Sequence, residues 1–177
     1  MKPHVAAEGL LHPLVLASVG VLVMNDHWAK ALWPGFLTGK LSDFAGLMFF
    51  PFLLQAAWEL GHALLRKPWS PSQRVLWAAA ISTTVVFAAV KVWAPAAELY
   101  RIAFGAARWP LDALVASLHG SALPAFSKVT LARDPTDLVA LVSVGVALFI
   151  GHRRVELLTR RSPARVASGA THRQSLT

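Results

Sequence analysis

Apolar residues occur along this chain in four long blocks rather than at alternating positions. Continuous apolar blocks are typical of segments that are buried on every side, whereas strict alternation would indicate half-buried strands. A helix of roughly 20 residues crosses the hydrocarbon core of a bilayer, and helices are favoured there because they satisfy their own backbone hydrogen bonds. The pattern therefore predicts four transmembrane helices, at about residues 10–24, 41–65, 75–95 and 137–151.

The composition agrees with a membrane location and excludes several kinds of site. Of the 177 residues, 55% are hydrophobic and 15% are charged, whereas an ordinary soluble domain has about 25% charged residues. The absence of cysteine excludes disulfides, thiolate metal sites and cysteine nucleophiles. The net charge is +8, but the basic residues are not interleaved with aromatic residues along one face, so nucleic acid is not an expected partner.

The distribution of Lys and Arg predicts the orientation of the helices. Four spans put both termini and the turn at 66–74 on one side of the membrane, and that side holds ten of the 17 Lys and Arg residues. Because basic residues are enriched on the cytoplasmic side, we expect both termini to be cytoplasmic, in the inner (cytoplasmic) membrane of a bacterium. Residues 1–159 then form a single four-helix transmembrane domain. Residues 160–177, rich in Arg, Ser and Ala, form a basic disordered cytoplasmic tail.

The long segment between the third and fourth spans predicts a further helix outside the membrane core. Leu111, Leu114, Val115 and Leu118 recur there at helical spacing. A helix with one apolar face lies at the membrane surface or covers the end of a helix bundle. We therefore expect an all-α integral membrane protein with four transmembrane helices and an extracytoplasmic interfacial helical segment.

The starts of the second and fourth spans resemble those of the VanZ-like family of small multi-pass bacterial membrane proteins. They read GKLSDFA from Gly39 to Ala45 and RDPTDLVA from Arg133 to Ala140. Family members carry something like D-K-x-x-H-F at the first place, and an arginine, two aspartates and an asparagine at the second. Here Gly39, Asp43 and Leu141 stand where the family has Asp, His and Asn. The resemblance, over about residues 10–152, implies a four-helix membrane protein that is in some members linked to resistance to lipoglycopeptide antibiotics such as teicoplanin.

Lys40, at the start of the second span, requires an anionic partner. Its positive charge opposes the helix macrodipole in the first turn and is costly beside apolar residues. One explanation is a local ion pair with Asp43, three residues further along the same helix face. The other is that Lys40, Arg133 and the free amides of two helix ends bind a lipid phosphate or pyrophosphate. Further groups could then surround the headgroup, namely Asp26, His27, Lys30 and Asp137.

The start of the fourth span has the pattern of a helix N-terminus. Asp134 is expected as the N-cap, Pro135 as the first helical residue and Asp137 as the third. Capping alone explains both aspartates. In the alternative explanation they join Arg133 in binding a ligand.

Asp26 and His27 are the candidates for catalysis, because they follow the first span on the expected outer face. An aspartate and a histidine together can supply a general base. A histidine beside an aspartate in an interfacial loop is also an ordinary polar contact, so both explanations stand. Whether the chain is an enzyme is left open by the sequence.

The inner half of the second span carries a polar stripe, Gln55, Glu59 and His62, on one helical face. Such a stripe predicts hydrogen bonds between helices in the interior of the bundle, or a path for protons or ions. Glu-x-x-His also occurs in di-iron bundles, but those require a second such motif, which the chain lacks, so we expect neither a metal nor another cofactor. Near the end of the third span, Lys91 is expected to extend to the interface or to pair with Glu98.

These observations leave three hypotheses about function. In the first, the protein binds anionic headgroups of envelope lipids, or a lipid-linked precursor, through an outward-facing polar cluster. In the second, it is a membrane enzyme acting on a lipid-linked phosphate or sugar. In the third, it is a structural subunit of a membrane complex with a protein partner, and its polar groups serve as helix caps.

Overall fold

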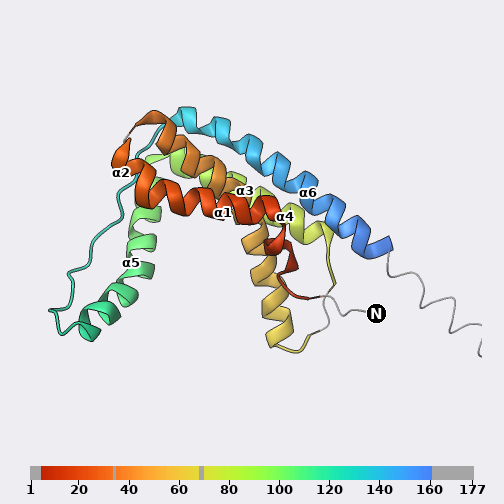
Figure 1. Ribbon diagram of the computed structural model, residues 1–177, viewed down its shortest axis with the longest axis horizontal. Helices are drawn as coiled ribbons and strands as arrows, with labels where there is room; N and C mark the ends of the chain where they lie inside the picture. The colour runs from red at the N-terminus through yellow and green to blue at the C-terminus, as the bar shows by residue number, and fades with distance from the viewer. Residues whose placement is uncertain (1–4, 34, 68–69, 161–177) are drawn as a thin grey trace, which may run out of the picture. The chain divides into compact units, whose positions relative to one another are not determined.

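The computed structural model describes residues 5–33, 35–67 and 70–160. Within these ranges the regular secondary structure is helical and contains no strand (Figure 1). Three described helical stretches are long and apolar enough to cross a membrane: Phe36–Leu64, Gln73–Val92 and Pro135–Leu158. They overlap the second, third and fourth predicted spans, which confirms an all-helical fold over the described residues, and their length and apolar composition are compatible with a membrane protein. The predicted tail lies outside the described residues, apart from its first residue.

The helix at the first predicted span is shorter than a membrane crossing requires. α1 (Pro13–Met24) has 12 residues; it begins at Pro13 because the His12 side chain accepts a hydrogen bond from the backbone N–H of Leu14 and because proline suits the first helical position. A π-helical segment, η2 (Asn25–Ala29), and a short helix, α2 (Lys30–Leu32), follow directly. The backbone therefore stays helical beyond Met24, where the sequence predicted a loop.

The helix at the second predicted span begins earlier than the sequence predicts. α3 (Phe36–Leu64) starts five residues before Leu41, at a turn that Thr38 stabilises: its hydroxyl accepts a hydrogen bond from the backbone N–H of Gly35 (3.2 Å) and lies 3.1 Å from the carbonyl oxygen of Trp33. Lys40 consequently lies in the second turn of α3 rather than the first. This corrects the expectation that its charge directly opposes the positive end of the helix dipole, since that effect is largest in the first turn.

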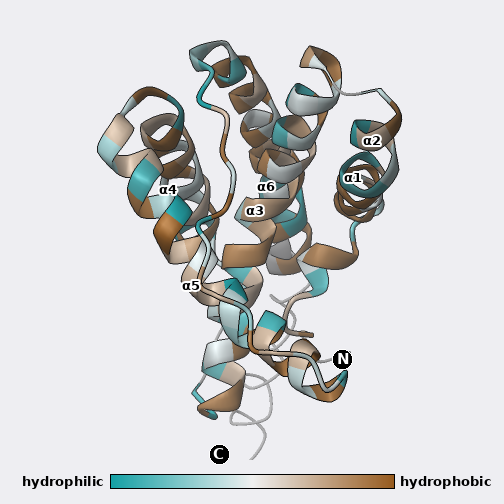
Figure 2. Cartoon of the chain, turned by 90° about the vertical axis from the view of Figure 1, so that its left-hand side faces the viewer, coloured by the Kyte–Doolittle hydropathy of each residue, from teal (hydrophilic) through white to brown (hydrophobic). Residues whose placement is uncertain are grey.

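The chain divides into two compact units, which we describe separately. The first comprises Met1–Thr84 and Ala140–Thr177, and in it α3 packs against both α1 and α6 (Val142–Arg160). Val15, Phe52 and Ala147, one residue from each of these helices, are buried together as its apolar core. Figure 2 shows that brown, apolar stretches of the helices are interrupted by short teal, polar ones.

Two further elements complete the first unit. η1 (Glu8–Leu11) is a 3-10 turn that precedes α1 and contacts α3. The N-terminal part of α4 (Gln73–Val92) lies against α6, where Gly151 makes room for Leu76: a Cβ at that glycine would lie 2.7 Å from the leucine methyl carbons.

The second unit, Val85–Val139, contains the end of α4, α5 (Ala94–Leu118) and the start of η3 (Pro135–Leu141). Between α5 and η3 runs a segment without regular secondary structure, residues 121–134, which we call the extended segment. The extended segment follows α5 back along its length. Gly105 permits the closest approach, because a Cβ there would lie 2.5 Å from the carbonyl oxygen of Ser127. The indole N–H of Trp109 donates to the carbonyl of Pro124 (2.9 Å). α5 therefore includes the predicted helix around Leu111 to Leu118 but begins far earlier.

Candidate functional site

A hydrogen-bonded polar cluster joins the π-helical segment to the first turns of α3. The Asn25 side-chain amide donates to the backbone carbonyl of Thr38 (2.6 Å) and to the Ser42 hydroxyl (2.7 Å). That hydroxyl donates to Asp26 Oδ1 (2.7 Å), which also lies 2.6 Å from Lys30 Nζ. We call these five residues the π-segment cluster.

The π-helical geometry and one unsatisfied oxygen mark this cluster as unusual. π-helical turns are rare and often occur at functional sites. Asn25 is 2% exposed, and its Oδ1 atom has no hydrogen-bond partner among the described residues. A buried acceptor without a donor costs about 1 to 3 kcal/mol. In contrast, the Asp26 and Lys30 side chains are each 42% exposed, so the cluster runs from a buried amide to an accessible ion pair.

His27 does not belong to this cluster. Its ring atom Nδ1 lies 3.0 Å from the carbonyl oxygen of Val23 in the preceding turn, and its ring is tilted against that of Trp28. The histidine therefore bonds to its own helix through Nδ1.

Lys40 projects from a different side of α3. It lies two residues from both Thr38 and Ser42, about 200° around the helix from each, because successive helical residues turn by about 100°. Its side chain is buried, with Nζ 4.3 Å from the centre of the Phe36 ring, a distance typical of a cation–π contact. Asp43, three residues further on, shares this side of the helix, and neither charged residue is without a partner.

In the second unit, Lys91 pairs with Asp137 and not with Glu98. Lys91 Nζ lies 2.6 Å from Asp137 Oδ2, and the two side chains are 8% and 10% exposed. The predicted partner, Glu98, is instead held by Lys128 and by Arg101 (3.2 Å). The expected Lys91–Glu98 pair is therefore wrong: the chain returns at η3 and places Asp137 closer. The hydrogen bond from Lys128 lowers the pKa of the Glu98 carboxyl, against a smaller opposing effect of desolvation.

Asp134 caps the start of the fourth span as the sequence pattern indicates. Its Oδ1 atom accepts hydrogen bonds from the backbone N–H (2.9 Å) and the hydroxyl (2.7 Å) of Thr136. The following turn is a 3-10 helix in which the Asp137 N–H bonds to the Asp134 carbonyl. Arg133 is exposed and donates to the carbonyl of Val92 (3.1 Å).

The polar stripe of α3 forms a second buried cluster in the first unit. Gln55 and Glu59 are each 2% exposed, and the Gln55 amide donates to Glu59 Oε1 (2.9 Å). The backbone N–H of Ala7 donates to Glu59 Oε2 (2.9 Å), and Arg154 Nη1 lies 3.9 Å from Oε1. His62 does not take part in this cluster: its Nδ1 atom lies 3.0 Å from the carbonyl oxygen of Trp58, and its ring is tilted by 41° against the Trp58 ring.

Three residues that take part in these clusters were not among the site residues that the sequence predicts: Asn25, Ser42 and Arg154. Asn25 and Ser42 are single polar residues at the facing ends of the first two apolar blocks. Two such residues on either side of one connection indicate a hydrogen bond between the helix ends. Arg154 was counted only as a cytoplasmic charge, because nothing local links it to the second span. A basic residue one turn inside an apolar helix end is the signal that could have found it.

The described residues contain no group of three or more His, Cys, Asp and Glu that could hold a metal ion. No protein-family model, curated protein or solved structure matches the chain.

Proposed function

We propose that this chain is a multi-pass protein of a bacterial cytoplasmic membrane that binds the headgroup of an anionic envelope lipid. Four spans are proposed: the helical run 13–32, α3, α4 and the stretch Pro135–Leu158. The first contains about 20 residues and is about 30 Å long at 1.5 Å per residue, long enough to extend from the hydrocarbon core to the headgroup region at Lys30. The charge bias supports cytoplasmic termini.

The observation that carries this proposal is the π-segment cluster. Lys30 offers an accessible ammonium group at the end of two apolar helices, which is where a lipid phosphate lies. Hydrogen bonds connect its partner Asp26 to the Ser42 hydroxyl and this hydroxyl to the Asn25 amide. The Oδ1 atom of that amide has no hydrogen-bond partner among the described residues. A headgroup hydroxyl, or a water molecule held under the headgroup, would supply the missing donor.

Lys40 and Arg133 are proposed as further anion-binding groups. Arg133 uses one guanidinium nitrogen on the Val92 carbonyl and is exposed, so its other N–H groups can reach a phosphate. Asp43 in the first unit and Asp137 in the second are proposed as orienting partners, each within its own unit. The resemblance of residues 39–45 and 133–140 to the VanZ-like family favours a role in the cell envelope and in the response to glycopeptide antibiotics.

Native mass spectrometry of the mildly extracted protein tests the proposal directly. We expect a specific anionic lipid to co-purify with the wild type and to be reduced about tenfold in Lys30→Gln and in the double variant Lys40→Ala/Arg133→Ala, since a hydrogen bond to a charged group contributes about 1.5 to 3 kcal/mol. Arg153→Gln is the matched control, because Arg153 is exposed and lies over the Phe149 ring, outside the cluster. Identical lipid in all four proteins would refute headgroup binding.

A second candidate function is that of a structural subunit with a protein partner. It is favoured by the number of polar groups that are satisfied within the chain, such as Asp134 by Thr136 and Glu59 by Gln55. Crosslinking to one stoichiometric partner would support it. The membrane-enzyme alternative has no comparable observation in its favour.

A further inference from the structure

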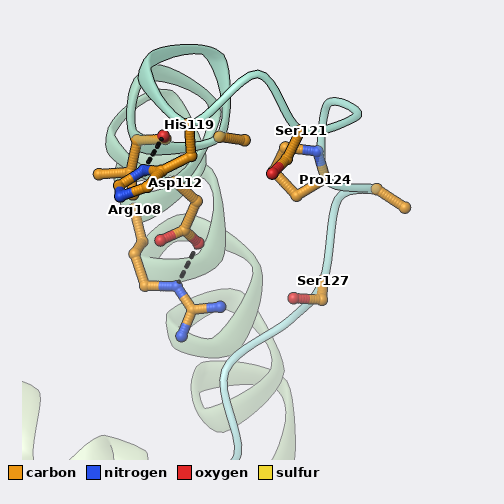
Figure 3. A pocket seen from close by; sticks show the side chains of 9 residues that line it. Arg108, Asp112, His119, Ser121, Pro124 and Ser127 are labelled. Atoms are coloured by element: carbon orange, nitrogen blue, oxygen red, sulfur yellow. Dashed lines mark hydrogen bonds and ion pairs between the residues drawn. The ribbon is translucent and has the colours of Figure 1, made fainter.

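A separate pocket lies wholly within the second unit, between the C-terminal half of α5 and the extended segment. Its volume is about 420 Å³, within the range of about 300 to 1,000 Å³ that is usual for small-molecule sites. Figure 3 shows six of its lining side chains: Arg108, Asp112, His119, Ser121, Pro124 and Ser127.

Both walls of this pocket are held in place by contacts outside its polar groups. The Trp109 indole bonds to the Pro124 carbonyl, and Gly105 brings the backbone of Ser127 close to α5. Arg101 accepts a hydrogen bond on its backbone carbonyl from the Val129 N–H and donates from its side chain to the Val129 carbonyl. The spacing between helix and segment is therefore set before any ligand binds.

The pocket offers an oriented guanidinium group. Arg108 Nε donates to Asp112 Oδ2 at 2.8 Å, which fixes the plane of the guanidinium (Figure 3). Its two terminal nitrogens have no hydrogen-bond partner in the part of the chain that the structure describes. A planar pair of free N–H groups is suited to the oxygens of a phosphate.

Hydroxyl and imidazole groups face the same space. The side-chain oxygens of Ser121 and Ser127 point from the extended segment toward α5 (Figure 3). His119 Nδ1 lies 2.8 Å from the carbonyl oxygen of Val115; because a carbonyl only accepts, this nitrogen carries the hydrogen and Nε2 is left to a ligand. The polar lining thus combines one cation with small donors and acceptors.

Several lining residues have a large, exposed apolar neighbour in the chain. Leu111 and Leu118 of α5, next to Asp112 and His119, are 64% and 76% exposed, and Leu123 and Phe126 of the extended segment are 65% and 50% exposed. A phospholipid suits this combination of groups, because its phosphate requires cationic and polar groups while its acyl chains require apolar surface.

We propose that this pocket binds the phosphate of an anionic membrane lipid, with Arg108 as the phosphate-binding residue and the exposed leucines of α5 in contact with the acyl chains. Asp112 is a positioning residue that orients the guanidinium. The pocket contains none of the residues on which the proposed function depends. A negative result at this pocket would therefore leave the proposed headgroup site untouched, and the reverse holds as well.

A fluorophore at a unique cysteine can report on this pocket, because the chain contains no native cysteine. Ala125→Cys places the label on the pocket wall without removing a polar group. The labelled full-length protein in detergent is titrated with dihexanoyl phosphatidic acid, dihexanoyl phosphatidylcholine and inorganic phosphate. We expect a saturable response to phosphatidic acid that is weakened about tenfold by Arg108→Gln and unchanged by the matched control Arg153→Gln.

Three outcomes would overturn the assignment. Equal affinity for phosphatidic acid in Arg108→Gln would remove the arginine from the site. Equal responses to inorganic phosphate and to the lipid would indicate an anion site without lipid specificity. A linear, unsaturable response would indicate surface adsorption. Lys40→Ala/Arg133→Ala, carried in the labelled background, should leave the response intact, which separates this pocket from the proposed headgroup site.

Discussion

Two buried carboxylates in the described part of the chain meet their basic partners in different ways. In the second unit, Asp137 meets the ammonium of Lys91 at 2.6 Å. In the first unit, Glu59 accepts hydrogen bonds from two neutral donors, the Gln55 amide and the Ala7 backbone, whereas Arg154 remains 3.9 Å away. The Asp137 carboxylate therefore has a close charge beside it, whereas the Glu59 carboxylate accepts hydrogen bonds from neutral donors.

This difference teaches that burial alone does not decide how much a charge partner contributes. A buried ion needs compensation for the water it has lost. Where a close cation contributes to this compensation, removing that cation is expensive. Where neutral donors share the task, the cation is partly redundant. Arg154 Nη2, buried and without a hydrogen bond among the described residues, agrees with this looser arrangement.

The largest effect is expected from Lys91→Met. Removing the close ammonium should lower the free energy of unfolding by about 3 to 5 kcal/mol, the usual cost of breaking a buried pair. The double variant Lys91→Met/Asp137→Leu should recover most of the loss, because it removes both charges. Thermal unfolding followed by circular dichroism in detergent measures this. Equal losses in the single and double variants would contradict it.

A smaller effect is expected from Arg154→Met, about 1 to 2 kcal/mol, because Glu59 keeps its two neutral donors. The same unfolding measurement, made in parallel with Lys91→Met, compares the two directly. The comparison of the ion pairs fails if the arginine variant is the less stable of the two.

Ala7→Gly tests the backbone that delivers the second neutral donor. Ala7 has a φ of 65°, in the left-handed region, where glycine carries no Cβ penalty. We expect a gain of about 0.5 to 1 kcal/mol, and Ala6→Gly, the adjacent control, should not stabilise. A loss of stability in Ala7→Gly would contradict the expectation that the left-handed backbone at this position destabilises the protein.

The smallest effect is a pH dependence at Glu98, which is accessible. Its folded-state pKa is lowered below the usual value, chiefly by the Lys128 hydrogen bond. The contribution to stability is therefore present above the unfolded pKa and is lost as the pH falls through the folded value. Melting temperatures of the wild type and Glu98→Gln should converge between about pH 5 and pH 3. A constant difference across this range would rule out the linkage.

Some features followed from the sequence because they depend on neighbouring residues. Long apolar blocks produced helices at the second, third and fourth predicted spans, since a helix satisfies its own backbone wherever it packs. The cap at Asp134 was equally local, because its acceptor and the Thr136 donors lie within one turn. Boundaries were less accurate: the turn at Gly35 and Thr38 moved the start of α3, and η2 continued the first helix past Met24.

The partners of buried charges were decided by the tertiary structure alone. Lys91 and Asp137, and likewise Glu59 and Arg154, are distant in the chain and meet only when their helices pack. The sequence determined that these charges needed compensation, because burying an ion in an apolar helix is costly. The sequence did not determine which residue would pair with each buried charge. That depends on how each helix is rotated and shifted along its axis, and packing between segments distant in the chain sets both.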